Sequence, residues 1–383
     1  MNNIIGVRSQ ESGVRPVVSF CIPVYNNAEA ALKIVNDLLV SDDARFEVVV
    51  SDDCSTDNAK ELLSQVKDPR FRYFRNEKNL GAHKNWEHSL ELGQGEYLYL
   101  IMGRDKMHGE NIPNLIQLLE YCRDNNVTYL KDRGRPKKSP RKIYSGIDAL
   151  AAFVDYNHPT GTIFYRNYFM EIPNRGHYFE IADMYPEAYV AKELLMKGKG
   201  AFISSGLSYG GFVIDKKKIK STVEHDVNLF ETYFAPKRRT LQFYELIDMI
   251  DPALSGIFTP KELNMYFGVK FYSLLKNVSY EWYSWLRDPE QMAHYGQKVH
   301  CVTVREMVQN IRKAYSDTKA HLKENGTYTA MKDRTMHLRM LEAYFVLIPH
   351  AIVKYHAKRL LKPLGLWEVL KFVKSKLKPS RLP

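Results

Sequence analysis

The chain has 383 residues, of which 45% are apolar and 12% aromatic, and its formal net charge is +11. This length accommodates a catalytic domain and an appended second unit, and the apolar content can fill a sizeable core. The four cysteines are far apart and form no CxxC pair, so neither a zinc ribbon nor a disulfide framework is indicated, and a reducing, cytoplasmic compartment is expected. The sequence shows no signal-peptide pattern and no uninterrupted apolar run of about 18 residues, so no membrane span is expected.

Most of the positive charge lies near the C-terminal end. Residues 351–383 contain nine Lys or Arg and a single acid, whereas the rest of the chain is nearly balanced. A net charge of this size indicates an anionic partner. Because the charge is not spread as in a nucleic-acid-binding groove, we expect no nucleic-acid partner.

Residues 17–130 alternate strand and helix patterns. Apolar, β-branched runs such as VVSFCIPVY, FEVVVSDD, YLYLIM and VTYL predict strands, and segments with apolar residues at helical spacing separate them. This alternation with short connections predicts an α/β fold with a mostly parallel sheet and helices on both faces. Beyond it come a cationic loop, KDRGRPKKSPRK, then mixed patterns, and from about residue 240 almost wholly helical patterns.

Polar residues follow the predicted strands where ligands bind on such sheets, outside the carboxyl ends. Tyr25 could stack on a base, Asp53 could accept a hydrogen bond from a base N–H, and Lys84 with Arg104 could face phosphates. A nucleotide site is the interpretation these side chains favour. The motifs GxxxxGK[ST], GxGxxG and HExxH are missing, which disfavours P-loop, dinucleotide and zincin chemistry.

Four elements in order resemble the family 2 glycosyltransferases of the GT-A fold. These are the P-x-Y-N of VSFCIPVYNN, the DD-x-S-x-D of FEVVVSDDCSTDNAKELL, the N-x-G of NLGAHKNW, and the G-E-Y strand of GEYLYLIMGRD. The resemblance covers residues 17–130 well and 131–215 loosely. It implies a Rossmann-like GT-A domain (17–240) after an N-terminal extension (1–16). The helical patterns that the resemblance does not cover predict a helical C-terminal region with a basic tail (241–383).

The resemblance also implies roles for individual residues at the nucleotide site. Pro23 and Tyr25 would line the base, Asp53 would bind the base edge, and Asp52 would support that turn. Lys84 matches a position where such enzymes often place a basic residue near the nucleotide. Each also has a structural interpretation, as a core aromatic, a turn residue or a solvated lysine.

The turn after the strand YLYLIM would hold the diphosphate. Asp105 matches the last aspartate of the family's DxD-type turn, which usually reaches the divalent metal, but Arg104 stands where relatives commonly have a second acid. One carboxylate could hold Mn2+ or Mg2+, since diphosphate oxygens and waters complete the shell. Alternatively, Arg104 neutralises the diphosphate itself. His158, Thr160 and Gly161 lie where relatives contact the donor sugar or acceptor, although a structural turn fits almost as well.

An inverting transfer needs a base that deprotonates the acceptor hydroxyl. In similar enzymes an acid before a helix ending in K-x-G acts as that base, and here Asp183 and Glu187 share one helix face at i, i+4. Counting back from Gly198 favours Glu187, whereas the position at the helix start favours Asp183, which we rank first. Either acid could also be an ordinary solvated one.

The last predicted helix, residues 364–378, is amphipathic. Its lysines lie opposite or beside an apolar stripe, a composition that suits a surface-lying membrane anchor and equally a helix docked on the protein. The stripe consists of Leu366, Val369, Leu370, Val373 and Leu377.

Together these patterns predict a cytoplasmic, peripherally membrane-associated inverting glycosyltransferase. It would move a sugar from a nucleotide-sugar donor, most simply a UDP-sugar, to a hydroxyl of a glycan or lipid-linked acceptor in capsule, lipopolysaccharide or other surface polysaccharide synthesis. The alternatives are a non-catalytic nucleotide-sugar or glycan-binding module and a nucleotidyltransferase. The latter needs a Gly-rich, Lys/Arg-containing loop after the first strand, which PVYNNAEA lacks.

Overall fold

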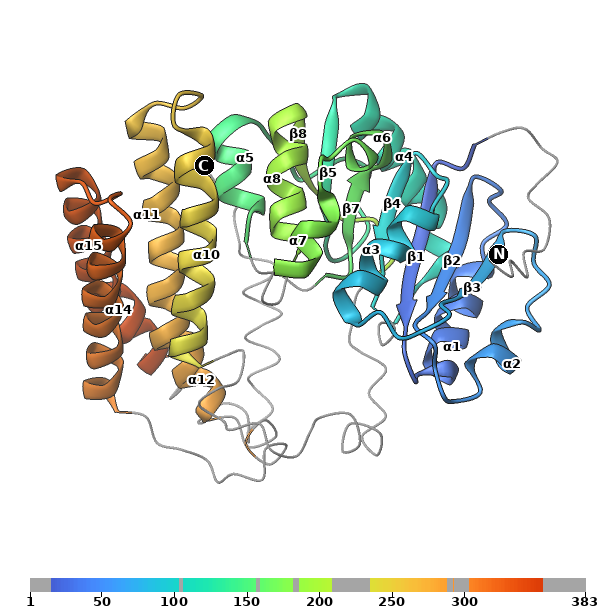
Figure 1. The fold of residues 1–383 in the computed structure, drawn as a ribbon, viewed down its shortest axis with the longest axis horizontal. Coiled ribbons are helices and arrows are strands. Elements are labelled where there is room, and N and C mark those ends of the chain that lie inside the picture. The colour runs from blue at the N-terminus through green and yellow to red at the C-terminus, as the bar shows by residue number, and fades with distance from the viewer. Residues whose placement is uncertain are drawn as a thin grey trace. The chain divides into compact units, whose positions relative to one another are not determined.

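The structure is a computed structural model, and it describes residues 15–102, 106–155, 159–181, 186–208, 235–287, 292 and 303–353. The chain divides into two compact units, residues 1–219 and 220–383. The division precedes the boundary at residue 240 that the sequence pattern predicts. Figure 1 labels the elements of both units.

The first unit is built on an eight-stranded sheet with the strand order β3-β2-β1-β4-β7-β5-β8-β6. The strands are β1 (Val18–Val24), β2 (Phe46–Asp52), β3 (Phe71–Arg75), β4 (Tyr97–Leu100), β5 (Val127–Asp132), β6 (Lys142–Tyr144), β7 (Thr162–Tyr165) and β8 (Lys199–Ile203). β7 pairs antiparallel with β4 and β5, and β6 with β8, while the other pairings are parallel. The predicted mostly parallel sheet is therefore confirmed.

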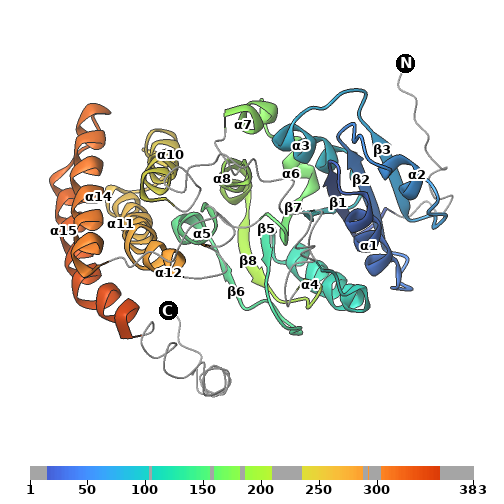
Figure 2. The same ribbon diagram turned by 90° about the horizontal axis from the view of Figure 1, so that it is seen from below.

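Helices cover both faces of this sheet, as Figure 2 shows. The helices of the first unit are α1 (Ala28–Leu39), α2 (Ala59–Leu63), the short η1 (Gly109–Asn111), α4 (Ile112–Asp124), α3 (Ala82–Leu92), α5 (Gly146–Phe153), α6 (Arg166–Met170), α7 (Arg175–Ile181) and α8 (Glu187–Lys197). α1 and α4 lie on one face, and α3 and α8 on the other. β1 and β2 are buried along their whole lengths, which explains why they are continuous apolar runs rather than alternating ones.

The second unit is helical in its described residues. Its helices are α10 (Pro236–Leu254), α11 (Pro260–Lys276), η3 (Asn277–Glu281), α12 (Trp282–Leu286), α14 (Val304–Glu324), α15 (Ala330–Glu342) and η4 (Ala343–Leu347). Phe271, Leu275 and Ile311 belong to a separate core. α11 and α14 each begin with a capping box, in which a Thr and a Glu satisfy each other's backbone N–H groups. The predicted helical C-terminal region is confirmed, and the predicted helix at 364–378 lies outside the described residues.

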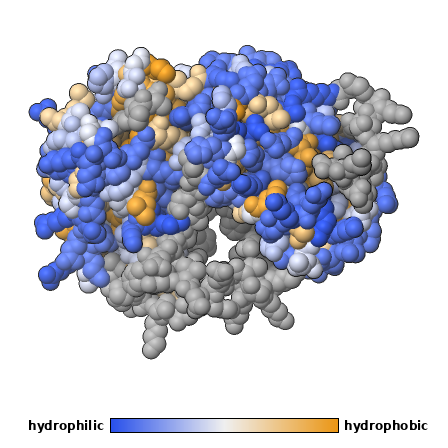
Figure 3. All heavy atoms as spheres, viewed as in Figure 1, coloured by the Kyte–Doolittle hydropathy of each residue, from blue (hydrophilic) through white to orange (hydrophobic). Residues whose placement is uncertain are grey.

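The carboxyl ends of β1, β2, β4 and β5 lie at one edge of the sheet, because these strands run in the same direction. In Figure 1 the arrowheads of β1 and β2 point down, so Figure 2, seen from below, faces this carboxyl edge. The described surface in Figure 3 is mostly hydrophilic, with small separate hydrophobic patches. The carboxyl edge is where a polar ligand is expected to bind.

Candidate functional site

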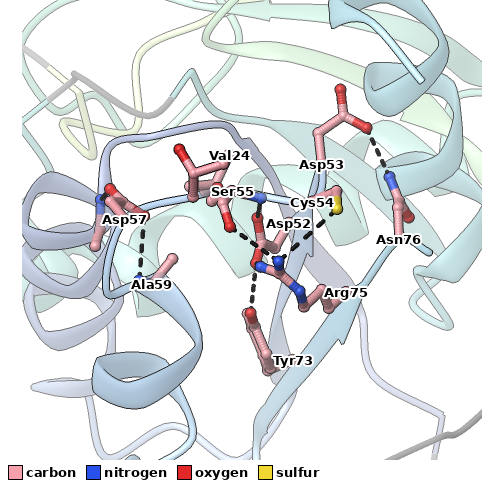
Figure 4. A network of polar contacts seen from close by, with 12 residues as sticks. Val24, Asp52, Asp53, Cys54, Ser55, Asp57, Ala59, Tyr73, Arg75 and Asn76 are labelled. Carbon is pink, nitrogen blue, oxygen red and sulfur yellow. Dashed lines mark hydrogen bonds and ion pairs between the residues drawn. The ribbon is translucent and has the colours of Figure 1, made fainter. Parts of the chain in front are cut away.

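The turn after β2 is held by Asp52, whose side chain is fully buried. One carboxylate oxygen accepts from the Ser55 backbone N–H at 2.9 Å, and the other accepts from the Tyr73 hydroxyl at 2.6 Å and from Arg75 Nη1 at 2.7 Å (Figure 4). Burial and the bond to Asp52 raise the pKa of Tyr73 well above its usual value. Through these bonds Asp52 links β3 to the turn that contains Asp53.

Asp53 is also buried, and its carboxylate accepts three hydrogen bonds. The donors are Asn76 Nδ2 at 3.0 Å and the backbone N–H groups of Leu80 at 2.7 Å and Gly81 at 3.0 Å. Asp53 therefore holds the N-x-G loop against the end of β2. A carboxylate offers about four acceptor positions, so one position remains for a ligand. Figure 4 shows one oxygen of Asp53 directed away from Asn76.

Tyr25 follows β1 and is 52% exposed, so its ring is available for stacking. The next residue, Asn26, has a positive φ of 49°, and its side-chain oxygen accepts from the Thr56 backbone N–H at 2.7 Å. Pro23, by contrast, is buried inside β1. Its missing N–H costs no sheet bond, since β4 pairs with β1 only as far as Cys21. Pro23 supports the strand beneath Tyr25, and the structure does not place it on the exposed surface.

Asn85 is a buried polar residue that the sequence patterns did not single out. Its Nδ2 donates to the Ser51 carbonyl at 3.0 Å, and its Oδ1 accepts from Ser51 Oγ at 2.7 Å and Asn76 Nδ2 at 3.1 Å. This network joins α3 to β2 and to the residue that binds Asp53. The available signal was a polar pair, Asn85 and Ser89, on the buried face of α3.

Lys84 lies on α3 and forms an ion pair with Glu180 of α7 at 2.9 Å. The hydrogen bond from Lys84 lowers the pKa of Glu180. Both side chains are about half exposed, and such pairs contribute little to stability. A phosphate could therefore replace Glu180 as the partner of Lys84.

The predicted metal ligand Asp105 and its neighbour Arg104 lie outside the described residues. Within the described part of the chain, no group of three or more His, Cys, Asp or Glu side chains is arranged to hold a metal ion. The metal site at this turn stays a prediction.

Thr160 and Gly161 connect the ends of β4 and β5. Thr160 Oγ1 accepts from the Met102 N–H at 2.8 Å, and the Gly161 N–H donates to the Leu100 carbonyl at 3.1 Å. Gly161 has a φ of +84°, and a Cβ there would lie 2.9 Å from the Asp132 carbonyl oxygen. These contacts give Thr160 and Gly161 a structural role at the start of the Asp105 turn. The third residue of that predicted group, His158, lies outside the described residues.

Glu187 begins α8 and is only 2% exposed, yet neither of its carboxylate oxygens has a hydrogen-bond partner in the described structure. Burial raises its pKa, and the positive charge of Lys131 partly opposes that rise. Lys131 is itself buried near the end of β5, where its Nζ donates to Thr162 Oγ1 and burial lowers its pKa. The other candidate base, Asp183, lies outside the described residues.

Lys131 was also missed in the sequence, although one lysine in the otherwise apolar VTYL-K-D strand end was a usable signal. Its neighbours place Glu187 at the carboxyl edge, because Lys131 and Thr162 are register partners and Thr162 also pairs with Leu100, the last residue of β4. The arrangement places at the carboxyl edge a carboxyl whose pKa burial raises to about 7, near the end of β5, which is separated by β7 from the strand β4 that leads to Asp105.

A family model described as "Glycosyl transferase family 2" matches residues 19–178. The chain contains a family 2 glycosyltransferase domain. The match spans β1 to β7 and includes Tyr25, Asp52, Asp53 and Lys84. This confirms the resemblance found in the sequence.

Curated relatives match this chain over limited stretches. The chain is 31% identical over 85 residues to the putative colanic acid biosynthesis glycosyl transferase WcaA of Escherichia coli, covering 22% of this chain and 30% of that one. It is 29% identical over 124 residues to the abequosyltransferase RfbV of Salmonella typhimurium, covering 30% and 36%. The chain thus spans about a third of the length of these relatives.

Solved structures resemble the chain more distantly. TarS residues 1–349 of S. aureus aligns with 16% identity and a TM-score of 0.42, covering 81% of this chain and 92% of that one. A mannosyltransferase from Pyrobaculum calidifontis, in complex with GDP-Man and Mn2+, aligns with 11% identity and a TM-score of 0.45, covering 90% of each chain. Because both scores are below 0.5, nothing about the site is inferred from them.

Proposed function

We propose that the chain is an inverting glycosyltransferase that moves a sugar from a UDP-sugar to a hydroxyl of a glycan or lipid-linked acceptor in surface polysaccharide synthesis. The observation that carries this proposal is the position of the family 2 domain's polar strand ends. The exposed Tyr25, the buried Asp53 and the buried Glu187, whose carboxylate has no hydrogen-bond partner among the described residues, all lie at the carboxyl edge. The names of WcaA and RfbV support a role in polysaccharide synthesis.

The nucleotide would bind at the ends of β1 and β2. The ring of Tyr25 offers a stacking surface, and the remaining lone pair of Asp53 suits a ring N–H such as that of uracil. Lys84 could exchange its exposed partner Glu180 for a phosphate. If a divalent metal binds, Asp105 would hold it, and the ion would offset charge on the leaving diphosphate.

The base in this proposal is Glu187. An unpartnered buried carboxylate is costly, and an acceptor O–H that donates to it would remove that cost. Burial also raises its pKa toward neutrality, where a general base is most effective. We therefore propose Glu187 as the base, while the first-ranked Asp183 lies outside the described residues.

The nucleotide site can be tested by UDP binding. We expect Tyr25→Ala to weaken UDP binding by roughly tenfold, on the order of the 1–3 kcal/mol that a base–aromatic stack contributes. Tyr121→Ala, which removes a 48% exposed tyrosine from α4, is the matched control and should leave UDP affinity unchanged. Equal affinities for wild type and Tyr25→Ala, measured by calorimetry, would remove Tyr25 from the site.

Membrane-surface association is proposed as well. Its predicted element, residues 364–378, lies outside the described residues, but the preceding helix, Ala330–Val353, has the hydropathy of a candidate membrane span with only 28% of its apolar window buried. The described residues that are apolar and exposed on it are Met331, Leu338, Leu341, Phe345, Val346 and Val353. Because charged residues occur within α15, we favour a helix lying on the surface over one that spans the bilayer.

Vesicle sedimentation tests this association. The full chain should bind phosphatidylglycerol vesicles more strongly than phosphatidylcholine vesicles, and Phe345→Glu with Val353→Glu should weaken that binding. Deletion of residues 364–383 should release the protein. Val40→Glu, at a 63% exposed valine of the first unit, is the control. Unchanged vesicle binding by both the double variant and the truncated chain would rule the association out.

A further inference from the structure

The segment that links β5 to β6 is rich in positive charge. Residues 133–142, RGRPKKSPRK, contain six Lys or Arg and no acid. Among the described residues, no acid forms an ion pair with five of the six cations, all of which are exposed. The five are Arg135, Lys137, Lys138, Arg141 and Lys142.

Hydrogen bonds hold this cationic segment against the carboxyl end of β8. The backbone N–H of Arg133 donates to the Ile203 carbonyl at 2.8 Å, and that of Lys137 to the Ser204 carbonyl at 2.7 Å. The Arg141 guanidinium donates through Nε to Ser204 Oγ at 2.7 Å. These bonds fix the positions at which the cations leave the backbone.

Like charges are held close together within the segment. Arg141 Nη2 donates to the Arg133 carbonyl at 3.2 Å, and the Arg133 guanidinium lies 4.6 Å from the Phe202 ring centroid. Desolvation and the charge of Arg141 lower the pKa of Arg133, and the charge of Asp155 only partly opposes this shift. The adjacent acid, Asp132, accepts from the Ser205 N–H at 2.8 Å and from a tyrosine hydroxyl instead. A bound anion would offset this repulsion.

The cationic segment begins at the carboxyl edge, on the side of β4 away from the nucleotide residues. Tyr25 and Asp53 follow β1 and β2, whereas the segment follows β5 and runs along β8, two or more strands beyond β4. The Asp132 N–H donates to the Gly161 carbonyl, so the ends of β5 and β4 are joined through one intervening strand. Those ends lie about 10 Å apart by the usual strand spacing.

We propose that residues 133–142 bind an anionic group of the acceptor, a phosphate or a carboxylate. The proposal rests on the proposed function, because the acceptor is the reactant that reaches the edge beyond β4. Guanidinium and ammonium groups bind both anions, and arginine can do so with two parallel hydrogen bonds. The anion has two chemical sources, a phosphate in the acceptor's carrier or backbone and a carboxylate on an acidic sugar.

Calorimetric titration of the full chain, saturated with UDP and at low salt, tests this site. The probes are inorganic pyrophosphate in one arm and tetragalacturonate in the other. We expect saturable binding in one arm at least, which identifies the source of the anion, and weaker binding at about 0.15 M salt because the charges are screened. Lys137→Ala with Lys138→Ala should weaken that binding about tenfold or more, equivalent to about 1.4 kcal/mol.

Lys60→Ala with Lys67→Ala, two exposed lysines of the same unit, removes the same charge elsewhere and should leave anion binding unchanged. The inference is overturned if neither probe binds, if the Lys137/Lys138 variant binds as tightly as wild type, or if the control variant weakens binding equally. UDP affinity separates the two proposals. Wild type that binds UDP but neither anion contradicts this inference alone, and wild type that fails to bind UDP contradicts the proposed function.

Discussion

At the scale of single residues, Glu187 and Lys131 form the least ordinary pair in the first unit. Both side chains are buried. Burial favours the neutral form of each, so it raises the pKa of the Glu187 carboxyl and lowers the pKa of the Lys131 ammonium. A carboxyl whose folded pKa is raised binds its proton more tightly than in the unfolded chain, so the free energy of unfolding falls as pH rises through this range. Retaining such a pair has a stability cost that a catalytic role explains.

The pair predicts a pH dependence. The base acts as a carboxylate, so activity rises with pH through the pKa of Glu187, and Lys131 lowers that pKa. Lys131→Met should therefore move the acid limb of the kcat profile to higher pH. Lys270→Met, at a 1% exposed lysine of the second unit, is the control for the loss of a buried lysine. An acid limb unmoved by Lys131→Met, or moved equally by both variants, would separate Lys131 from the base.

At the scale of elements, Gly161 joins the carboxyl ends of β4 and β5 through its backbone hydrogen bonds. Gly161 and Gly81 share a φ of +84°, a value that strains an alanine at either position. A Cβ at Gly161 would lie 2.9 Å from a carbonyl oxygen, whereas at Gly81 it meets nothing within 4 Å. Gly161→Ala should thus lower the free energy of unfolding of the first unit by roughly 1–3 kcal/mol more than Gly81→Ala does. If urea denaturation showed that both variants lose the same free energy of unfolding, the nearby carbonyl oxygen would not disfavour a Cβ at Gly161.

The same scale shows what the sequence could predict. Strand ends of a parallel sheet converge, so Tyr25 and Asp53 could be placed at one edge from the order of the patterns alone. The hydrogen-bond donors to Asp53 could not be predicted in this way, since Leu80 and Gly81 belong to a loop 27 and 28 residues further along the chain. Asn85 and Lys131 were missed because a polar residue is expected to be exposed. Only the packing shows that each lies on a buried side of its helix or strand. The burial of Pro23 could not be predicted, because a motif gives a residue's position and not the direction of its side chain.

At the scale of the whole molecule, the two units differ in what supports their interpretation. The first contains the family 2 domain and both candidate ligand sites, whereas the second is a helical unit whose described end has exposed apolar residues. The cationic segment of the first unit and the basic tail of the second suit anionic partners of different kinds, an acceptor and a lipid surface. The central claim concerns the first unit, namely transfer from a UDP-sugar with Glu187 as the base.

UDP release from a panel of UDP-sugars, with and without Mn2+, tests this claim most directly when wild type is compared with Glu187→Gln. The amide has nearly the same shape but cannot accept the acceptor's proton. Wild type should release UDP from at least one donor, and Glu187→Gln should slow that release by about 10²–10⁴-fold with UDP affinity unchanged. Release by Glu187→Gln at the wild-type rate, or UDP binding by wild type without turnover of any donor, would contradict the account.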